Sequence, residues 1–171
     1  MAITAVLIWI VVGAALSTAA RAIVRRISRP TSGADTLTGL PTRGAGQTVI
    51  DSLRPGDAVA MVDLDGLKTT NDTRGHAAGD DDLVALAQHL AAGVRRGDTV
   101  ARWGGDEFVV ILRGGADAGA GVVDRLRASS PVCFSAGIAV HHDGTGTATL
   151  AAADAALLAA KRAGGSRVVA A

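Results

Sequence analysis

The chain has 171 residues, of which 49% are hydrophobic, so it can bury the core of one globular domain and has little length left for a second. Its 17 Lys and Arg residues and 16 Asp and Glu residues give a formal net charge of +1, which argues against a nucleic-acid-binding protein with a broad cationic face. The single cysteine, Cys133, excludes a disulfide within the chain and favours a reducing compartment.

The first segment of the chain is apolar. Residues 2–20 contain no charged side chain, and a helix of this length, at about 1.5 Å per residue, just crosses a hydrocarbon layer of about 30 Å. We therefore predict a transmembrane helix at residues 1–20 and a basic juxtamembrane linker at residues 21–34. Because the arginines follow the apolar segment, we expect a single-pass protein of the inner (cytoplasmic) membrane with residues 35–171 in the cytoplasm. The alternatives are a cleaved secretory signal, which lacks its positively charged leader here, and a buried core helix.

Helices and strands alternate in the rest of the chain. A continuous apolar run at residues 58–64 predicts a buried strand that ends in Asp63 and Asp65, and a Gly-Gly pair within residues 99–112 predicts a β-hairpin. Residues 68–79 are polar and rich in turn-forming residues. The other expected elements are helices at 45–53, 80–96 (the longest), 116–128 and 149–163, a strand at 131–140 with Cys133 in the core, and a closing strand at 166–169.

This order of elements predicts an α+β domain of the ferredoxin-like type, with a mostly antiparallel central sheet. A right-handed crossover from the strand at 58–64 to the first hairpin strand, with the return strand between them, places Asp63 beside Asp106 in the hairpin turn. Either residue alone is compatible with an ordinary strand end or turn. Two carboxylates brought together repel each other unless a cation lies between them, so the pair predicts a Mg²⁺ site.

Several motifs then identify a family. They are Asp-x-Leu-Thr-Gly-Leu at 35–40, Asp-Leu-Asp-Gly-Leu-Lys-x-x-Asn-Asp at 63–72, Gly-His-x-x-Gly-Asp at 75–80, Arg-x-Gly-Gly-Asp-Glu-Phe at 102–108, Ser-x-Gly at 135–137, and Ala-Asp-x-Ala-Leu-x-x-Ala-Lys at 153–161. In these motifs residues 35–169 resemble the GGDEF family, the diguanylate cyclases. The resemblance implies a nucleotidyl-cyclase palm-type fold and the condensation of two GTP molecules, one per subunit of a homodimer, into cyclic di-GMP and two pyrophosphates. It also implies Mg²⁺ or Mn²⁺ as cofactor and no nucleic-acid partner.

The resemblance also assigns roles to individual residues. The metal ligands are Asp63, Asp106 and the backbone carbonyl of Leu64, and Glu107 is either a metal ligand or a base at the reacting 3′-hydroxyl. The remaining roles are guanine recognition by Asn71 and Asp80, phosphate binding by Lys68, Lys161 and the amides of Gly66 and Leu67, and close approach of the backbone to the nucleotide at Gly104 and Gly105.

A second site is suggested by Arg95 and Asp98, an Arg-x-x-Asp set with five residues between it and Gly104. In the family this spacing marks a product site that inhibits the enzyme, so we expect product inhibition. Arginines near a helix C-terminus are also favoured by the helix dipole, which is the simpler explanation.

The chain departs from the family at a few positions. Gly165 stands where a basic residue is common, so a phosphate contact is lost unless Arg162 or Arg167 supplies it. Packing positions differ at Thr42, Leu67 and Leu158. The first hypothesis is therefore a membrane-anchored diguanylate cyclase. The alternatives are a catalytically weak or inactive receptor that binds GTP or cyclic di-GMP, and a structural membrane adaptor.

Overall fold

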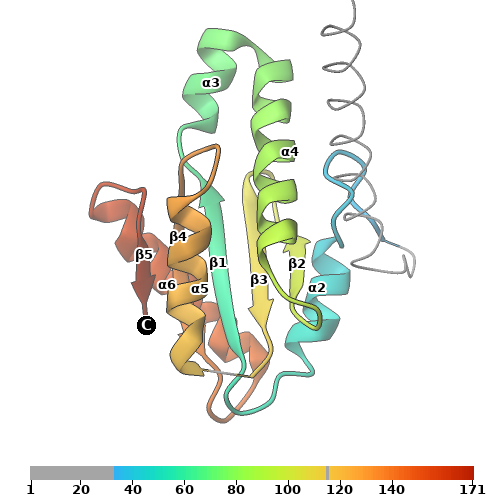
Figure 1. Cartoon of the computed structure of the whole chain (residues 1–171), viewed down its shortest axis with the longest axis vertical. Coiled ribbons are helices and arrows are strands. Elements are labelled where there is room, and N and C mark those ends of the chain that lie inside the picture. The colour runs from blue at the N-terminus through green and yellow to red at the C-terminus, as the bar shows by residue number, and fades with distance from the viewer. Residues whose placement is uncertain (1–32, 115) are drawn as a thin grey trace, which may run out of the picture.

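The computed structural model describes residues 33–114 and 116–171, which form a five-stranded sheet with helices on both faces (Figure 1). The helices are α2 (Arg43–Ile50), α3 (Leu67–Arg74), α4 (His76–Gly93), α5 (Ala116–Ala128) and α6 (Gly146–Arg162). The strands are β1 (Ala58–Leu64), β2 (Thr99–Arg102), β3 (Glu107–Leu112), β4 (Phe134–Val140) and β5 (Val168–Ala170).

The sheet has the strand order β2-β3-β1-β4-β5. Strand β1 is antiparallel to both of its neighbours, β3 and β4, and only the β4–β5 pair of these five strands is parallel. The hairpin's return strand β3 therefore lies between β1 and β2, as the sequence predicted. This placement brings the end of β1 next to the turn of the hairpin.

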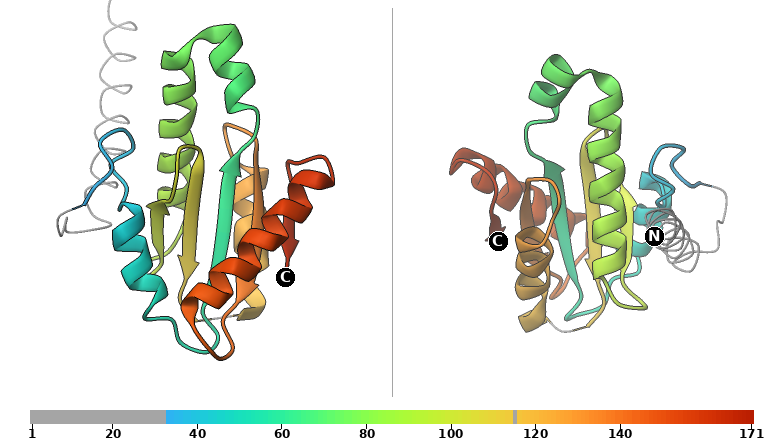
Figure 2. Two further views of the ribbon diagram at one scale, coloured as in Figure 1. Left: turned by 180° about the vertical axis from the view of Figure 1, so that it is seen from behind. Right: turned by 45° about the horizontal axis from the view of Figure 1, so that its top comes forward.

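Side chains alternate along β1 between two separate parts of the core. Ala58, Ala60, Val62 and Leu64 pack with α4 and α5, whereas Val59 and Met61 pack with α2 and α6. Figure 2 shows these two helix pairs on opposite faces of the sheet. Because the period of a strand is two residues, Asp63 continues the row that faces α2 and α6.

Helix α6 lies unusually close to the sheet at Gly137 of β4. A Cβ atom at this glycine would stand 2.0 Å from the backbone nitrogen of Leu157 and 2.2 Å from the carbonyl oxygen of Ala153. The face of α6 turned to the sheet is built mainly of alanines, which permits this approach. The position of α6 is thus set by backbone packed against backbone.

Three local predictions are wrong. The segment expected to be turn-rich, 68–79, contains most of α3 and the start of α4, and the helix expected at 80–96 begins at His76 and ends at Gly93. Helix α3 buries none of its residues, so it offers no apolar periodicity to detect, and it is held by packing on α4. Cys133, expected in the core, is exposed and precedes β4. Its neighbour Phe134 fills the core instead.

The predicted inner-membrane location is contradicted. Among residues 33–114 and 116–171, no helix combines the length and the apolar character that crossing a bilayer requires. The transmembrane helix predicted at residues 1–20 lies outside the described residues, and the membrane has no part in the function proposed below.

Candidate active site

Four carboxylates and one ammonium gather where β1 meets the hairpin turn. We call this set, Asp63, Asp65, Asp106, Glu107 and Lys161, the carboxylate cluster. Asp63 and Glu107 are directly opposite each other in the β1–β3 pairing, so their side chains share one face of the sheet. The backbone N–H of Leu64 donates to the carbonyl oxygen of Asp106 at 3.1 Å, which ties the turn to the end of β1. The strand pairing therefore joins the two acidic segments that the topology predicted would meet.

Lys161, near the end of α6, reaches across to this edge. Its Nζ lies 2.5 Å from Oδ1 of Asp63 and 2.6 Å from Oδ1 of Asp65. Asp65 also accepts hydrogen bonds from the Ser135 hydroxyl and from the backbone N–H of Ser166. The sequence predicted Lys161 as a phosphate ligand, and the structure shows its ammonium between the two aspartates.

The cluster holds more negative than positive charge, and this shows in its proton affinities. Burial raises the pKa of Asp63, and the charges of Asp106 and Asp65 add to that effect, so that the Lys161 ammonium offsets it only in part. Burial and the charges of Asp63, Asp106 and Asp154 raise the pKa of Glu107 in the same way. Burial lowers the pKa of Lys161, but its bonds to Asp63 and Asp65 outweigh this and leave it raised. Asp63 and Glu107 are thus acids whose ionised forms lack sufficient positive charge.

Arg102 fixes the hairpin turn. Its guanidinium donates to the carbonyl oxygens of Gly104 (3.2 Å) and Gly105 (2.7 Å) and to Oδ1 of Asp35 (3.0 Å). Burial alone would raise the pKa of Asp35, but hydrogen bonds from Thr38 and Arg102 hold it below its usual value. The turn is therefore fixed through both of its glycine carbonyls.

The two glycines of the turn have different surroundings. A Cβ at Gly104 would stand 2.6 Å from a carboxylate oxygen of Glu107, so a larger residue there would displace the end of that side chain. At Gly105 a Cβ would meet nothing within 4 Å.

Next to the turn, the Arg43 guanidinium stacks on the ring of Trp103, 4.9 Å from its centroid.

Helix α3 begins directly beyond the carboxylate cluster. Gly66 takes a left-handed conformation (φ 77°) that turns the chain from β1 into the helix, and Thr70 makes the first helical hydrogen bond back to it. The amides of Leu67, Lys68 and Thr69 precede that bond, so they have no partner within the helix. The exposed Lys68 stands on the same first turn. Backbone amides and a cation at a helix N-terminus suit an anion such as a phosphate.

The predicted guanine-binding residues come together where α3 packs on α4. A Cβ at Gly79 would stand 2.0 Å from Oδ1 of Asn71, so the Asn71 side chain lies directly on the glycine. Asp80 follows Gly79 and is exposed. The Asn71 amide therefore lies against the residue that precedes Asp80, where α3, at the top of Figure 1, packs on α4.

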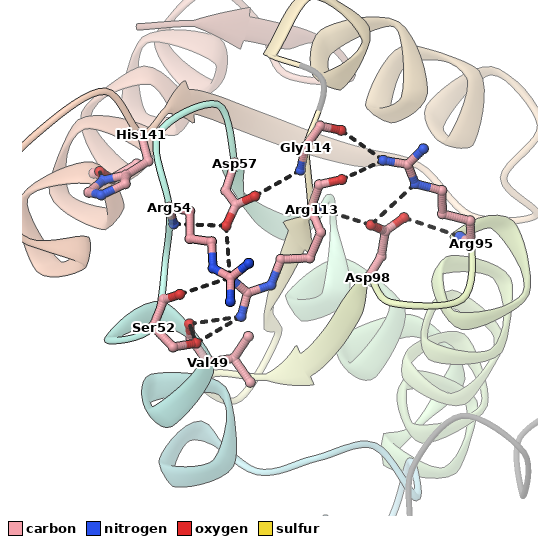
Figure 3. A network of polar contacts seen from close by, with 10 residues as sticks. Val49, Ser52, Arg54, Asp57, Arg95, Asp98, Arg113, Gly114 and His141 are labelled. Carbon is pink, nitrogen blue, oxygen red and sulfur yellow. Dashed lines mark hydrogen bonds and ion pairs between the residues drawn. The ribbon is translucent and has the colours of Figure 1, made fainter.

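Arg95 and Asp98 lie at the opposite end of the sheet, about 20 Å from the cluster along the seven residues of β1. Figure 3 shows them in a network with Asp57 and Arg113, and we call these four residues the arginine cluster. Asp98 accepts from the backbone N–H groups of Arg95 (3.1 Å) and Arg113 (2.9 Å). Arg95 donates to the carbonyl oxygens of Arg113 and Gly114. The predicted product site is thus separate from the carboxylate cluster.

The sequence interpretation missed several residues that shape the site. Asp65 was noted only as a strand end, although two carboxylates two residues apart at the end of a buried strand lie on the same face. Ser135 stands directly opposite Asp63 in the β1–β4 pairing, which a correct strand register would have shown. No local pattern announces that Arg102 holds the turn or that Ser166 donates its N–H to Asp65.

Comparisons with known proteins agree with this geometry. The family described as "Diguanylate cyclase, GGDEF domain" matches residues 32–167. Diguanylate cyclase DgcP of Pseudomonas aeruginosa is 39% identical over 155 residues, covering 78% of this chain and 23% of the relative. An uncharacterised 19.3 kDa protein of Streptomyces ambofaciens is 42% identical over 144 residues, covering 74% of this chain and 77% of the relative.

A solved structure shows the same fold. The GGDEF domain of DgcB from Caulobacter crescentus, crystallised in complex with c-di-GMP, superposes with a TM-score of 0.74 at 28% identity, covering 84% of this chain and 98% of that one. The chain spans about a quarter of the length of DgcP, so it corresponds to one part of that relative. From the family match, the fold and the motif residues on one edge of the sheet, the chain belongs to the GGDEF family of diguanylate cyclase domains.

Proposed function

We propose that this chain is a Mg²⁺-dependent diguanylate cyclase that condenses two GTP molecules into cyclic di-GMP with release of two pyrophosphates. The observation that carries the proposal is the strand pairing that brings Asp63, Asp106 and Glu107 together at one end of the sheet, next to the N-terminus of α3. This end of the sheet combines oxygen ligands for a metal with a site for phosphates. The relative DgcP, a diguanylate cyclase, shares this domain.

The residues of the carboxylate cluster fit a divalent cation in charge and in donor type. Asp63, Asp106 and Glu107 supply the hard oxygen donors that Mg²⁺ and Mn²⁺ accept, and their mutual repulsion favours a cation among them. In the described part of the chain no three His, Cys, Asp or Glu side chains form a ready metal-binding group. This suits Mg²⁺, which commonly takes one or two carboxylates together with phosphate oxygens of the substrate. The backbone carbonyl of Leu64 would add a further oxygen. When bound, the metal would neutralise charge on the transferring phosphoryl group.

The side chains around the cluster would bind different parts of the nucleotide. Asn71 and Asp80 would hold the guanine, because an amide and a carboxylate match its O6 acceptor and its N1 and N2 donors. Lys68, Lys161 and the amides at Gly66 and Leu67 would bind the β- and γ-phosphates. These contacts orient the α-phosphorus toward the edge of the sheet and favour GTP over ATP.

In the family's reaction Glu107 would lie beside the 3′-hydroxyl, which loses its proton as it attacks the α-phosphorus. Its raised pKa brings it closer to the range in which a carboxylate accepts a proton, which favours a base. Its neighbours Asp63 and Asp106 equally favour a metal ligand. The rate of a Glu107→Gln variant as a function of pH separates these roles. If Glu107 is the base, the variant loses the pH dependence that Glu107 causes. If Glu107 is a metal ligand, the variant changes its metal requirement at every pH.

One chain of this fold has one carboxylate cluster, and the reaction joins two GTP molecules. We therefore propose a homodimer in which two carboxylate clusters face each other and each 3′-hydroxyl attacks the α-phosphorus of the other nucleotide. Activity should then rise with the square of the enzyme concentration while the protein is mostly monomeric. A linear dependence in that range would contradict the dimer.

The test of the main proposal is turnover. The chain incubated with GTP and Mg²⁺ should form cyclic di-GMP and pyrophosphate, detected by chromatography, and ATP in place of GTP or removal of the metal by chelation should prevent this. Absence of cyclic di-GMP would contradict the enzyme. The alternative is a receptor that binds GTP or cyclic di-GMP without turnover; it is favoured by Gly165, where a basic residue is common in the family. Calorimetry that shows binding without product would support the receptor.

We further propose that cyclic di-GMP inhibits the enzyme at Arg95 and Asp98. These residues and Arg125 line a cavity of about 400 Å³ between the end of α4 and α5. Two guanidinium groups suit the phosphates and guanine edges of the product. Asp98 already accepts two backbone N–H groups and its side chain is only 4% exposed, so a guanine would reach it by displacing part of this network.

The Arg95→Ala variant should keep its initial rate and lose the slowing that follows product accumulation. The exposed neighbour Arg96 does not line the cavity, so Arg96→Ala is the matched control and should remain inhibited. Inhibition that persists in Arg95→Ala would remove this part of the proposal.

A further inference from the structure

Asp65 is bonded to three parts of the chain that are distant in sequence. Its carboxylate accepts from Lys161 Nζ at 2.6 Å, from the Ser135 hydroxyl at 2.9 Å and from the backbone N–H of Ser166 at 2.9 Å. These donors belong to α6, to β4 and to the segment before β5. The Asp65 side chain is only 21% exposed, so the bonds lie largely within the protein. Asp65 is therefore where these three elements are joined beside the carboxylate cluster.

Lys161 depends on such acceptors for a defined position. A lysine ammonium stands on a flexible four-carbon stem, and it is placed only where acceptors hold it. Here it bonds to Asp63 and to Asp65, and with three N–H donors it keeps one for a further acceptor. If Asp63 serves a metal ion, Asp65 is the acceptor that continues to hold the lysine.

The backbone around Asp65 is shaped for this arrangement. Gly165 and Ser166 both have positive φ angles, 71° and 49°, and this bend turns the N–H of Ser166 toward Asp65. A Cβ at Gly165 would stand 3.3 Å from Oδ1 of Asp65 and 3.3 Å from the Ser135 hydroxyl, so the glycine leaves room for the network. For Ser166 the left-handed conformation is uncommon, and its bond to Asp65 compensates for it.

We propose that Asp65 is a positioning residue that fixes the Lys161 ammonium at the place where the phosphates of a bound nucleotide lie, leaving Asp63 to the metal. The inference rests on the proposed function, because it requires Lys161 to contact phosphate. Asp65 itself touches neither nucleotide nor metal and acts through Lys161. In this chain, where Gly165 offers no cation, the placement of Lys161 carries more of the phosphate binding.

A double-mutant cycle tests the inference. The probe is 3′-deoxy-GTP with Mg²⁺, which cannot react, and its affinity is measured by calorimetry for the wild type, Asp65→Asn, Lys161→Met and the double variant. Each single variant should bind about tenfold more weakly, as expected for loss of one charged hydrogen bond. The double variant should bind no more weakly than Lys161→Met, because Asp65 has no separate contact to lose. Losses that multiply in the double variant would overturn the inference.

A second measurement needs no nucleotide. The order parameter of the Lys161 side chain, measured by NMR, should fall in Asp65→Asn and stay at the wild-type value in Asp143→Asn, a matched change at an exposed carboxylate before α6. An unchanged order parameter in Asp65→Asn would overturn the inference. If the wild type fails to bind 3′-deoxy-GTP, the proposed function fails, and this measurement still decides whether Asp65 holds Lys161.

Discussion

Both ends of the sheet carry acidic and basic side chains, buried acids at one end and half-buried acids at the other, but the balance of charge differs between them. In the arginine cluster two aspartates, Asp57 and Asp98, face two arginines and several backbone N–H groups. Burial alone would raise the pKa of Asp57, but hydrogen bonds from the Arg54 N–H, Arg113 and the Gly114 N–H hold it below its usual value. In the carboxylate cluster one ammonium serves four acids, and the pKa of Asp63 is raised by burial and by its acidic neighbours.

This difference separates the Asp57–Arg113 pair, which stabilises the fold, from the carboxylate cluster, whose acids suit a bound cation or substrate. A carboxylate with a lowered pKa has enough donors around it, so its ionised form stabilises the fold. A carboxylate with a raised pKa lies where the surrounding groups do not stabilise its ionised form. Such carboxylates are typical of sites that bind a cation or a substrate. The two clusters therefore predict opposite responses to the same kind of mutation.

The largest effect is expected at the turn. Asp106→Asn removes one of the charges that would hold the metal and should lower turnover about a thousandfold, while the free energy of unfolding stays the same or rises. Product formation and urea denaturation measure the two quantities. Asp143→Asn, at an exposed site away from the cluster, is the control and should turn over normally. Wild-type turnover in Asp106→Asn would refute the role of this carboxylate.

The opposite result is expected at the other end of the sheet. Asp57→Asn leaves the Arg113 guanidinium without its ion pair at 2.7 Å and weakens the bond from the Gly114 N–H, so the free energy of unfolding should fall by about 2 kcal/mol. Turnover measured well below the melting temperature should change little. The control is Asp51→Asn, because Asp51 is exposed and, within residues 33–114 and 116–171, its side chain accepts only from that of Gln47, so its loss should cost less than about 0.5 kcal/mol. Equal losses in the two variants would show that the Asp57 network contributes nothing special.

The pH dependence of stability should also differ. The raised pKa of Glu107 means that its protonated form stabilises the fold below its ordinary pKa of 4.5, and this contribution is lost as the pH rises through the raised value. Glu107→Gln should therefore be more stable than the wild type at pH 7, with a flatter profile above pH 4.5. Asp57 acts in the reverse sense: its contribution is present above pH 3.8 and is lost as the pH falls below it. Urea denaturation across this range measures both, and parallel profiles for wild type and Glu107→Gln would contradict the first.

The smallest expected effect is that of the metal alone. Millimolar Mg²⁺ should raise the melting temperature of the wild type by about 1–3 °C, because a cation that binds only the folded state stabilises it. The shift should disappear in Asp106→Asn and persist in Asp57→Asn. The same shift in all three proteins would indicate a general salt effect.

Sequence reasoning succeeded where an apolar pattern dictates structure. The bounds of β1 and α5 were predicted to the residue, because a continuous apolar run and a clear helical periodicity mark them. The meeting of Asp63 with the hairpin turn followed from the handedness of the crossover. Helix α3 was missed because none of its residues is fully buried, and the partner of Lys161 was missed because Asp65 is 96 residues away. Likewise, nothing in the Arg-x-x-Asp spacing shows that Asp98 is already bonded to backbone amides.

The close approach of α6 to Gly137 also fixes the position of Lys161, which lies further along the same helix. A single added methyl group there would collide with main-chain atoms that have no rotamer to change, so the whole helix would have to move outward. Lys161 lies only one turn beyond Leu157, about 6 Å along the same rod, and would be carried away from the two aspartates with it. Since misplacement by about 1 Å can slow an enzyme about a hundredfold, a residue with no side chain and no substrate contact is among the least replaceable in the chain.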